Sequence, residues 1–266
     1  MKHVIVSQFD PVSEADLKRI LSYRREKGMT DLWLTVSEEG ILDRKTRLGL
    51  LAKAVRPYRR LHVAEDAENA EYMEPLDEEI IRHGIYRKAA QGIRKDLIEQ
   101  GYYLNETAKA MCNPHRYAHT CSVAETAREI AAVHGMDQKK AWVMGMLHDL
   151  TKGFSDEANR KIIEIYKPDW LDISPKVWHS YTGVIFAKQN MCLADRDIAY
   201  AMEHHTIGDG KTDWAHLLYI ADKIEPLRGY DVSEQRKSAE KNLAAAANMI
   251  REQSKAYILE TEGIHV

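Results

Sequence analysis

Three short stretches in the second half of this 266-residue chain place histidine or aspartate in helices that we expect to be otherwise apolar. These are RYAHT (116–120), LHDLTK (147–152) and IADKIEP (220–226). A carboxylate in an apolar helix is costly unless it is paired or bound to a metal. We therefore predict a metal site, whose candidate ligands are His119, His148, Asp149 and Asp222.

His148 and Asp149 are neighbours in AWVMGMLHDLTKG, which we predict to belong to a helix over 138–153. Consecutive helical residues point about 100° apart, so the two side chains share an ion only if it lies between their directions. A histidine taken alone is more often structural than a ligand. Packing rarely explains a carboxylate beside it, so the pair favours chelation.

The mixture of imidazole and carboxylate donors suits iron, manganese or zinc better than calcium or magnesium. Water on such an ion becomes a nucleophile near neutral pH, and the ion also neutralises phosphate charge. The residues thus predict metal-dependent hydrolysis of a phosphate compound, in which Asp149 binds the metal and helps to orient the nucleophile. They leave the identity of the metal and the number of ions open.

Two basic residues follow these ligands closely. Lys152 comes three residues after Asp149 and should project toward the same side, where it could neutralise phosphate. A lysine that interacts with the helix dipole at a helix end explains it equally well. Arg228 could contact phosphate in a bidentate manner, and the alternative is a surface ion pair with Glu225.

Several further histidines lie between the ligand stretches. His179 and His205 could bind a second ion, hydrogen-bond phosphate oxygens or protonate the leaving group. Since His204 and His205 are adjacent, the residues alone do not show which one faces the site. His216 lies about 120° off the face of Asp222 and is interpreted as structural.

Elements of two kinds should position these residues. The first part alternates predicted strands (3–8, 31–36, 59–65) with helices (13–28, 44–57), which indicates a parallel sheet. Ser13 and Asp16 form a potential capping box at the first helix. The acidic stretch 65–79 is interpreted as a solvated loop or as the edge of a shortened domain.

From about Arg87 onward the pattern is helical. Expected helices span 87–101, 117–134, 138–153, 156–166, 175–190, 194–205, 212–225 and 233–260. We therefore divide the chain into a small α/β domain over 1–105 and an all-α domain over 106–266, each of ordinary size.

Composition and net charge limit the kinds of partner that we expect the protein to bind. Hydrophobic residues make up 44% of the chain, and no stretch approaches the roughly 20 apolar residues of a membrane span. Neither a signal peptide nor a cysteine motif is apparent, so we expect a cytoplasmic protein without membrane contact. The net charge of −3 offers no electrostatic case for a nucleic-acid partner. A homodimer remains open.

The three ligand stretches, together with WHSYTG (178–183) and HHTIG (204–208), resemble the HD-domain hydrolases, and most closely the symmetrical bis(5'-nucleosyl)-tetraphosphatases. The resemblance implies an iron-dependent enzyme that splits diadenosine tetraphosphate into two ADP. It also implies four metal ligands and a set of substrate contacts. The implied ligands are His119, His148, Asp149 and Asp222, and the implied phosphate contacts are His179, His205, Thr206 and Arg228.

The first part more weakly resembles the nicotinate-nucleotide adenylyltransferases. SQFDP (7–11) matches the opening motif of that family, and GIRKDLIEQG (92–101) resembles its terminal helix. SEAD (13–16) replaces the imidazoles expected to bind triphosphate. The resemblances together imply an α+β two-domain chain, in which a truncated, degenerate nucleotidyltransferase-like domain precedes an all-α HD domain.

Three other functions remain to be separated from this one. The same site could serve a broader nucleotide phosphohydrolase, or the chain could sense nucleotides without catalysis. Adenylyl transfer by the first part is disfavoured because its imidazoles are missing.

Overall fold

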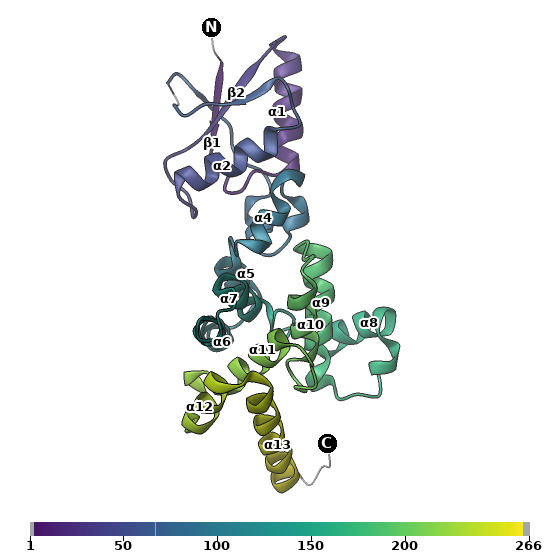
Figure 1. Ribbon diagram of the computed structural model, residues 1–266. Coiled ribbons are helices and arrows are strands. Elements are labelled where there is room, and N and C mark those ends of the chain that lie inside the picture. Colours follow the sequence, from purple (N-terminus) through teal and green to yellow (C-terminus); the bar gives the residue numbers. More distant parts are fainter. Residues whose placement is uncertain (1–2, 67, 263–266) are drawn as a thin grey trace. The chain divides into compact units, whose positions relative to one another are not determined.

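The computed structural model describes residues 3–66 and 68–262, which group into two compact units (Figure 1). The first unit comprises Met1–Thr107 with Gln189–Cys192, and the second comprises Ala108–Lys188 with Leu193–Val266. Most of the described chain is helical, with a small sheet near the N-terminus. Each unit is described separately below.

The first unit contains a parallel sheet of four strands in the order β3-β2-β1-β4. Its strands are β1 (Val4–Ser7), β2 (Leu32–Val36), β3 (Leu61–Val63) and β4 (Glu71–Tyr72). Helices α1 (Glu14–Glu26) and α2 (Arg44–Val55) connect the first three strands. The predicted β-α-β-α-β arrangement is confirmed, because the apolar strands are buried between their crossovers.

The predicted capping box starts α1. The backbone N–H of Asp16 donates to Ser13 Oγ, and the backbone N–H of Ser13 donates to Asp16 Oδ2, both at 2.9 Å. Asp16 is fully buried and also accepts from the backbone N–H of Leu76 at 2.9 Å. Its carboxylate is therefore engaged in holding the start of the helix.

The acidic stretch 65–79 contributes an edge strand. Within it β4 pairs in parallel with β1, through Ile5–Glu71 and Val6–Tyr72. For Glu71 and Tyr72 the interpretation as a loop is therefore wrong, because they form the edge of the sheet. Both β4 side chains are exposed, so their pairing leaves no apolar pattern in the sequence.

The rest of the first unit consists of short helical turns. They are α3 (Glu78–Arg82), η1 (Tyr86–Lys88), η2 (Gln91–Ile93), α4 (Arg94–Glu99) and the start of α5 (Leu104–Met111). A single helix over 87–101 is thus wrong. The backbone at Gly92 lies so close to α2 that a Cβ there would be 2.8 Å from the carbonyl oxygen of Lys53.

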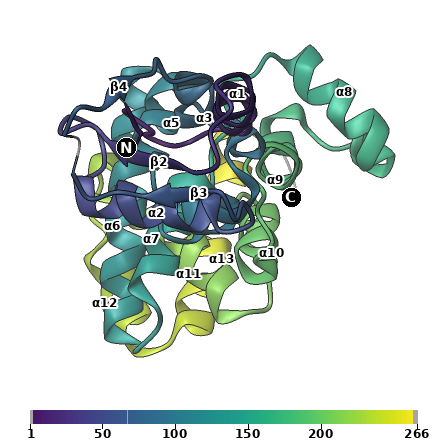
Figure 2. The ribbon, with the colours of Figure 1, turned by 90° about the horizontal axis from the view of Figure 1, so that it is seen from above.

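The second unit is helical throughout its regular elements. They are α6 (Pro114–Val133), α7 (Gln138–Leu147), α8 (Asp156–Tyr166), η3 (Pro168–Trp170), η4 (Pro175–Val177), α9 (Trp178–Asn190), α10 (Arg196–His204), α11 (Asp213–Ile224), η5 (Pro226–Arg228), α12 (Ser233–Lys241) and α13 (Leu243–Glu262). Helix α11 packs against α6, α10 and α13, and α6 packs along α7 (Figure 2). Through these contacts α11 forms the centre of the unit.

The helix expected over 233–260 is interrupted at Asn242. This residue is extended, and its side-chain oxygen accepts from the backbone N–H of Ala245 at 2.9 Å. The interruption therefore caps the start of α13 and turns it away from α12. Among the described helices, none combines the length and the hydropathy that crossing a bilayer requires.

Glu78 is a buried carboxyl group of the first unit. Its Oε1 accepts from the backbone N–H of Asp10 at 2.6 Å, and its Oε2 lies 3.2 Å from Arg82. Burial nevertheless raises the pKa of Glu78 from 4.5 to about 7. Glu78 is therefore ionised in the unfolded chain at a pH where it is still protonated in the folded protein.

Because the folded pKa is the higher one, Glu78 contributes stability below about pH 4.5 and loses it as the pH rises to about 7. Between pH 5 and pH 8, the free energy of unfolding of the parent protein should fall more than that of Glu78→Gln. The difference should be on the order of 3 kcal/mol at most. Urea unfolding at the two pH values measures this. Glu79→Gln, at an exposed neighbour, is the control, and parallel profiles of Glu78→Gln and the parent protein would contradict the prediction.

Candidate metal centre and active site

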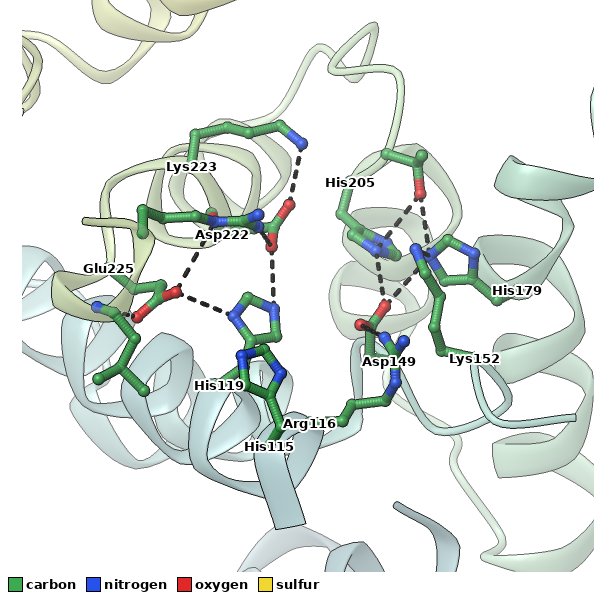
Figure 3. Close-up of a pocket in the computed structure, with 13 residues that line it drawn as sticks. His115, Arg116, His119, Asp149, Lys152, His179, His205, Asp222, Lys223 and Glu225 are labelled. Carbon is green, nitrogen blue, oxygen red and sulfur yellow. Dashed lines mark hydrogen bonds and ion pairs between the residues drawn. The ribbon is translucent and has the colours of Figure 1, made fainter. Parts of the chain in front are cut away.

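The second unit contains a cavity of about 390 Å³ lined largely by charged and polar side chains (Figure 3). They come from α6, α9, α11, η5 and the turns after α7 and α10. The lining residues are His115, Arg116, His119, Asp149, Lys152, His179, His205, Thr206, Asp222, Lys223, Glu225, Leu227 and Arg228. The cavity brings together every predicted site residue except His148, which lies buried beside it.

His148 and Asp149 lie at the end of a helix rather than inside one. Helix α7 ends at Leu147, and the backbone N–H of Leu150 donates to the carbonyl oxygen of Leu147 at 3.3 Å in a tighter turn. The predicted helix over 138–153 is therefore too long. The turn relaxes the helical spacing and leaves His148 Nε2 3.8 Å from Asp149 Oδ2.

A close helix crossing positions the first two histidines. A Cβ at Gly145 of α7 would lie 2.4 Å from Cα of Ala124 in α6, so only glycine allows this approach. The crossing brings the imidazoles of His119 and His148 to a centroid distance of 5.4 Å. Local packing thus joins two ligand stretches that are 29 residues apart in sequence.

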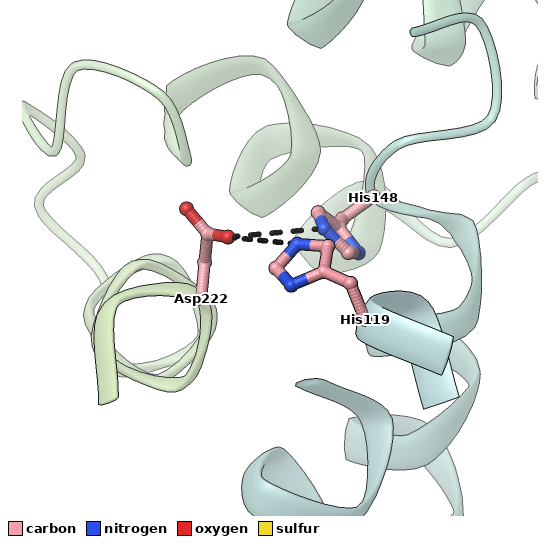
Figure 4. A group of neighbouring side chains, drawn as sticks. All are labelled: His119, His148 and Asp222. Carbon is pink, nitrogen blue, oxygen red and sulfur yellow. Dashed lines mark ion pairs between the residues drawn. The ribbon is translucent and has the colours of Figure 1, made fainter. Parts of the chain in front are cut away.

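One donor group consists of His119, His148 and Asp222 (Figure 4). Asp222 Oδ1 lies 3.3 Å from His119 Nε2 and 4.0 Å from His148 Nε2. Two donors bound about 2.1 Å from one ion are separated by roughly 3.0–3.4 Å at tetrahedral or octahedral angles. The His119–Asp222 separation already fits a shared ion, and the His148–Asp222 separation would have to shorten by roughly 0.6–1.0 Å.

A second donor group shares His148 and adds Asp149 and His205. Asp149 Oδ1 lies 3.6 Å from His205 Nε2 and 3.1 Å from His179 Nε2. His148 and two of the predicted phosphate contacts, His179 and His205, thus meet around the carboxylate of Asp149. Because the two donor groups are adjacent and share His148, their donors could bind one ion or two.

Backbone carbonyls orient two of these imidazoles. His148 Nδ1 lies 2.6 Å from the carbonyl oxygen of Gly145, and His205 Nδ1 lies 2.7 Å from that of Met202. Because a carbonyl only accepts, each Nδ1 carries the proton and each Nε2 presents a lone pair. Nε2 of His148 is buried and has no hydrogen-bond partner among the described residues. A buried acceptor without a donor suits a bound cation.

The protonation states also fit metal binding. Burial lowers the pKa of both His148 and His179 to about 4, so both are neutral near pH 7. Burial opposes ionisation of Asp149 and Asp222, but neighbouring basic groups hold both carboxyl pKa values well below their ordinary range. Neutral imidazole and ionised carboxylate are the forms that bind a metal ion.

Four basic side chains surround these donors. Arg116 lies 3.1 Å from Asp149 Oδ2, Lys223 lies 3.1 Å from Asp222 Oδ2, and Arg228 lies 2.6 Å from Asp222 Oδ1. Lys152 Nζ lies 3.0 Å from His179 Nε2, and burial lowers the Lys152 pKa. The cavity thus combines donors for a cation with positive charges for a phosphate chain.

The structure distinguishes between the adjacent histidines. His205 is buried in the donor group, whereas His204 pairs with Asp209 at 2.6 Å and does not line the cavity. Thr206 also lines it, with Oγ1 3.4 Å from both His179 Nε2 and His205 Nε2. His216 belongs to neither donor group.

Sequence reasoning missed three charged residues of the cavity. Arg116 precedes His119 by three residues, and Glu225 follows Asp222 by three, so each lies one helical turn from a predicted ligand. Lys223 is the neighbour of Asp222. Their spacing of three residues from a predicted ligand could have identified Arg116 and Glu225 in the sequence. Only the three-dimensional contacts reveal the role of Lys223.

Comparison with known proteins gives a consistent result. Residues 116–227 match the HD domain family. Over 142 residues the chain is 37% identical to the symmetrical bis(5'-nucleosyl)-tetraphosphatase of Bacillus subtilis (strain 168), covering 52% of this chain and 76% of that protein. It is 29% identical to the protein of the same name from Halalkalibacterium halodurans, covering 53% and 78% of the two chains.

Two further similar proteins have names or descriptions that mention nicotinate nucleotides or NAD metabolism. The chain is 31% identical to a probable nicotinate-nucleotide adenylyltransferase/Ap4A hydrolase of Mycoplasma genitalium, over 54% of this chain and only 43% of that longer protein. A crystal structure from Clostridium acetobutylicum, described as a predicted HD superfamily hydrolase involved in NAD metabolism, superposes with a TM-score of 0.55 at 28% identity. It covers 60% of this chain and 88% of that one.

Asp149 belongs to the second donor group and lies beside the shared His148, so Asp149→Asn should weaken metal binding on the order of 100-fold or more, because a neutral amide replaces a carboxylate ligand. Titration with Mn²⁺ followed by elemental analysis measures the loss. Asp213→Asn, at an exposed position outside the cavity, is the matched control. Unchanged metal content in Asp149→Asn would refute the role of this carboxylate.

Proposed function

This chain belongs to the HD-domain hydrolases, and on that premise we propose that it hydrolyses dinucleoside polyphosphates with the help of a bound metal ion. The preferred substrate in this proposal is diadenosine tetraphosphate, which is split into two ADP. The observation that supports it best is the joining of two donor groups through His148 beside four basic side chains in one cavity. A chain of negatively charged phosphates needs both a bound cation and basic side chains.

The metal in this proposal is iron, with manganese and zinc as alternatives that suit the same donors. His119, His148, Asp149 and Asp222 would hold it. When bound, the ion would supply a nucleophile from water near neutral pH and would neutralise phosphate charge. The unpartnered Nε2 of His148 is the strongest support for such an ion.

Basic and hydroxyl side chains of the cavity would bind the phosphates. Arg116 and Arg228 present guanidinium groups, and Thr206 presents a hydroxyl donor. His179 is neutral near pH 7, because burial lowers its pKa to about 4, so it fits an acceptor or ligand better than a proton donor. Lys152, with its lowered pKa, is the better candidate to protonate the departing ADP.

We also propose that residues 1–105 form a degenerate nucleotidyltransferase-like domain without adenylyl transfer. Open parallel sheets bind ligands beyond the carboxyl ends of their strands. Here Arg47 is buried at that edge and donates to the carbonyl oxygens of Gln8, after β1, and Ser37, after β2, at 2.8 and 2.9 Å. Its guanidinium group is thus bonded to the backbone at the edge of the sheet where such a ligand would bind.

A product assay tests the main proposal. Protein purified without oxygen or chelators and loaded with Fe²⁺ should convert diadenosine tetraphosphate to ADP as the sole nucleotide product. Formation of ATP with AMP would contradict symmetrical cleavage, and release of free phosphate would favour a broader nucleotide phosphohydrolase. Binding without turnover would favour a nucleotide sensor.

A further inference from the structure

Glu225 lies directly after α11 and is almost completely buried, with 2% exposure. Its two oxygens have different partners (Figure 3). Oε1 lies 3.0 Å from Nδ1 of His119, and Oε2 accepts from the backbone N–H of Leu227 at 2.7 Å. Ser122, three residues after His119 on α6, also hydrogen-bonds this carboxylate. A single side chain after α11 thus contacts α6 at two positions.

His119 differs in this respect from two other imidazoles of the site. His148 and His205 each place Nδ1 near a backbone carbonyl three residues earlier, in the last turn of the helix that precedes them. Their orientation is therefore set locally. His119 instead depends on a side chain that follows α11, the helix that supplies Asp222. The end of α11 and the residue after it thus contribute both Asp222 and Glu225 to the site, and both side chains contact the imidazole of His119.

We propose that Glu225 is a positioning residue, which accepts a hydrogen bond from Nδ1–H of His119 and thereby directs the Nε2 lone pair toward the cation site. Nε2 already lies 3.3 Å from Asp222 Oδ1, the other donor of this group. A carboxylate in this position fixes the tautomer, holds the ring in place and increases the donor strength of the imidazole.

The second oxygen of Glu225 extends this role to the phosphate side of the cavity. Its bond to the backbone N–H of Leu227 caps the short turn η5, which ends with Arg228. Arg228 then reaches back to Asp222, with Nε 2.8 Å from the Asp222 carbonyl oxygen. Loss of the carboxylate would therefore loosen a metal ligand and a phosphate contact together.

This inference depends on the proposed cation site but not on the identity of the substrate. Titration of the full-length protein with Mn²⁺, followed by electron paramagnetic resonance of the free ion, tests it. Glu225→Gln should bind Mn²⁺ about 10- to 100-fold more weakly than the parent protein, because the amide cannot accept hydrogen bonds at both positions.

Asp209→Asn is the matched control, since it alters a carboxylate–imidazole pair with His204 that lies outside the cavity. Its affinity for Mn²⁺ should equal that of the parent protein. Equal affinity of Glu225→Gln and the parent protein would overturn the role of Glu225. Absence of Mn²⁺ binding by the parent protein itself would instead overturn the proposed metal site.

A second measurement needs no variant at Glu225. In Zn²⁺-loaded parent protein labelled with ¹⁵N-histidine, His119 should show a slowly exchanging, downfield Nδ1–H resonance, assigned by its loss in His119→Asn. A rapidly exchanging Nδ1 proton, or metal bound at Nδ1, would overturn the inference. This readout remains decisive if Glu225→Gln does not fold.

Discussion

Two buried carboxylates, Asp149 and Asp222, need compensating positive charge, and the second unit is arranged to provide it. Removing an ionised carboxylate from water costs several kcal/mol unless hydrogen bonds and opposite charges replace the solvent. Imidazoles, guanidinium groups and ammonium groups from several helices converge on these two side chains. The same concentration of charge that makes the site costly to fold also makes it suitable for a cation and a polyphosphate.

Much of the site could be predicted because its chemistry is visible residue by residue. A histidine or aspartate in an apolar helix is conspicuous in sequence, and the structure brings His119, His148, Asp149 and Asp222 together as donors. The exact end of α7 was not visible, because the turn after Leu147 is set by tertiary packing. Glu225 was missed as a site residue, since an acidic residue near a helix end is also typical of a solvated surface.

In the fold, too, some elements could be predicted from the sequence and others could not. The strands before and after α1 were predictable because their apolar runs are buried by the helices that connect them. β4 was not, because it joins the sheet through its backbone while both of its side chains remain exposed. The break before α13 depends on the side chain of Asn242 capping the next helix, which competes with a continuous amphipathic pattern. Local hydrogen bonds, rather than periodicity, decided these boundaries.

The position of Arg47 has a consequence for any attempt to engineer a ligand site at the carboxyl ends of β1 and β2. Space for a ligand beside these strand ends would have to be made by removing a buried guanidinium group that belongs to the core. Removing that group would leave several carbonyl oxygens without donors and weaken the sheet edge. At this edge of the sheet, stability and ligand capacity are alternatives, so creating a ligand site there would require redesign of the interior first.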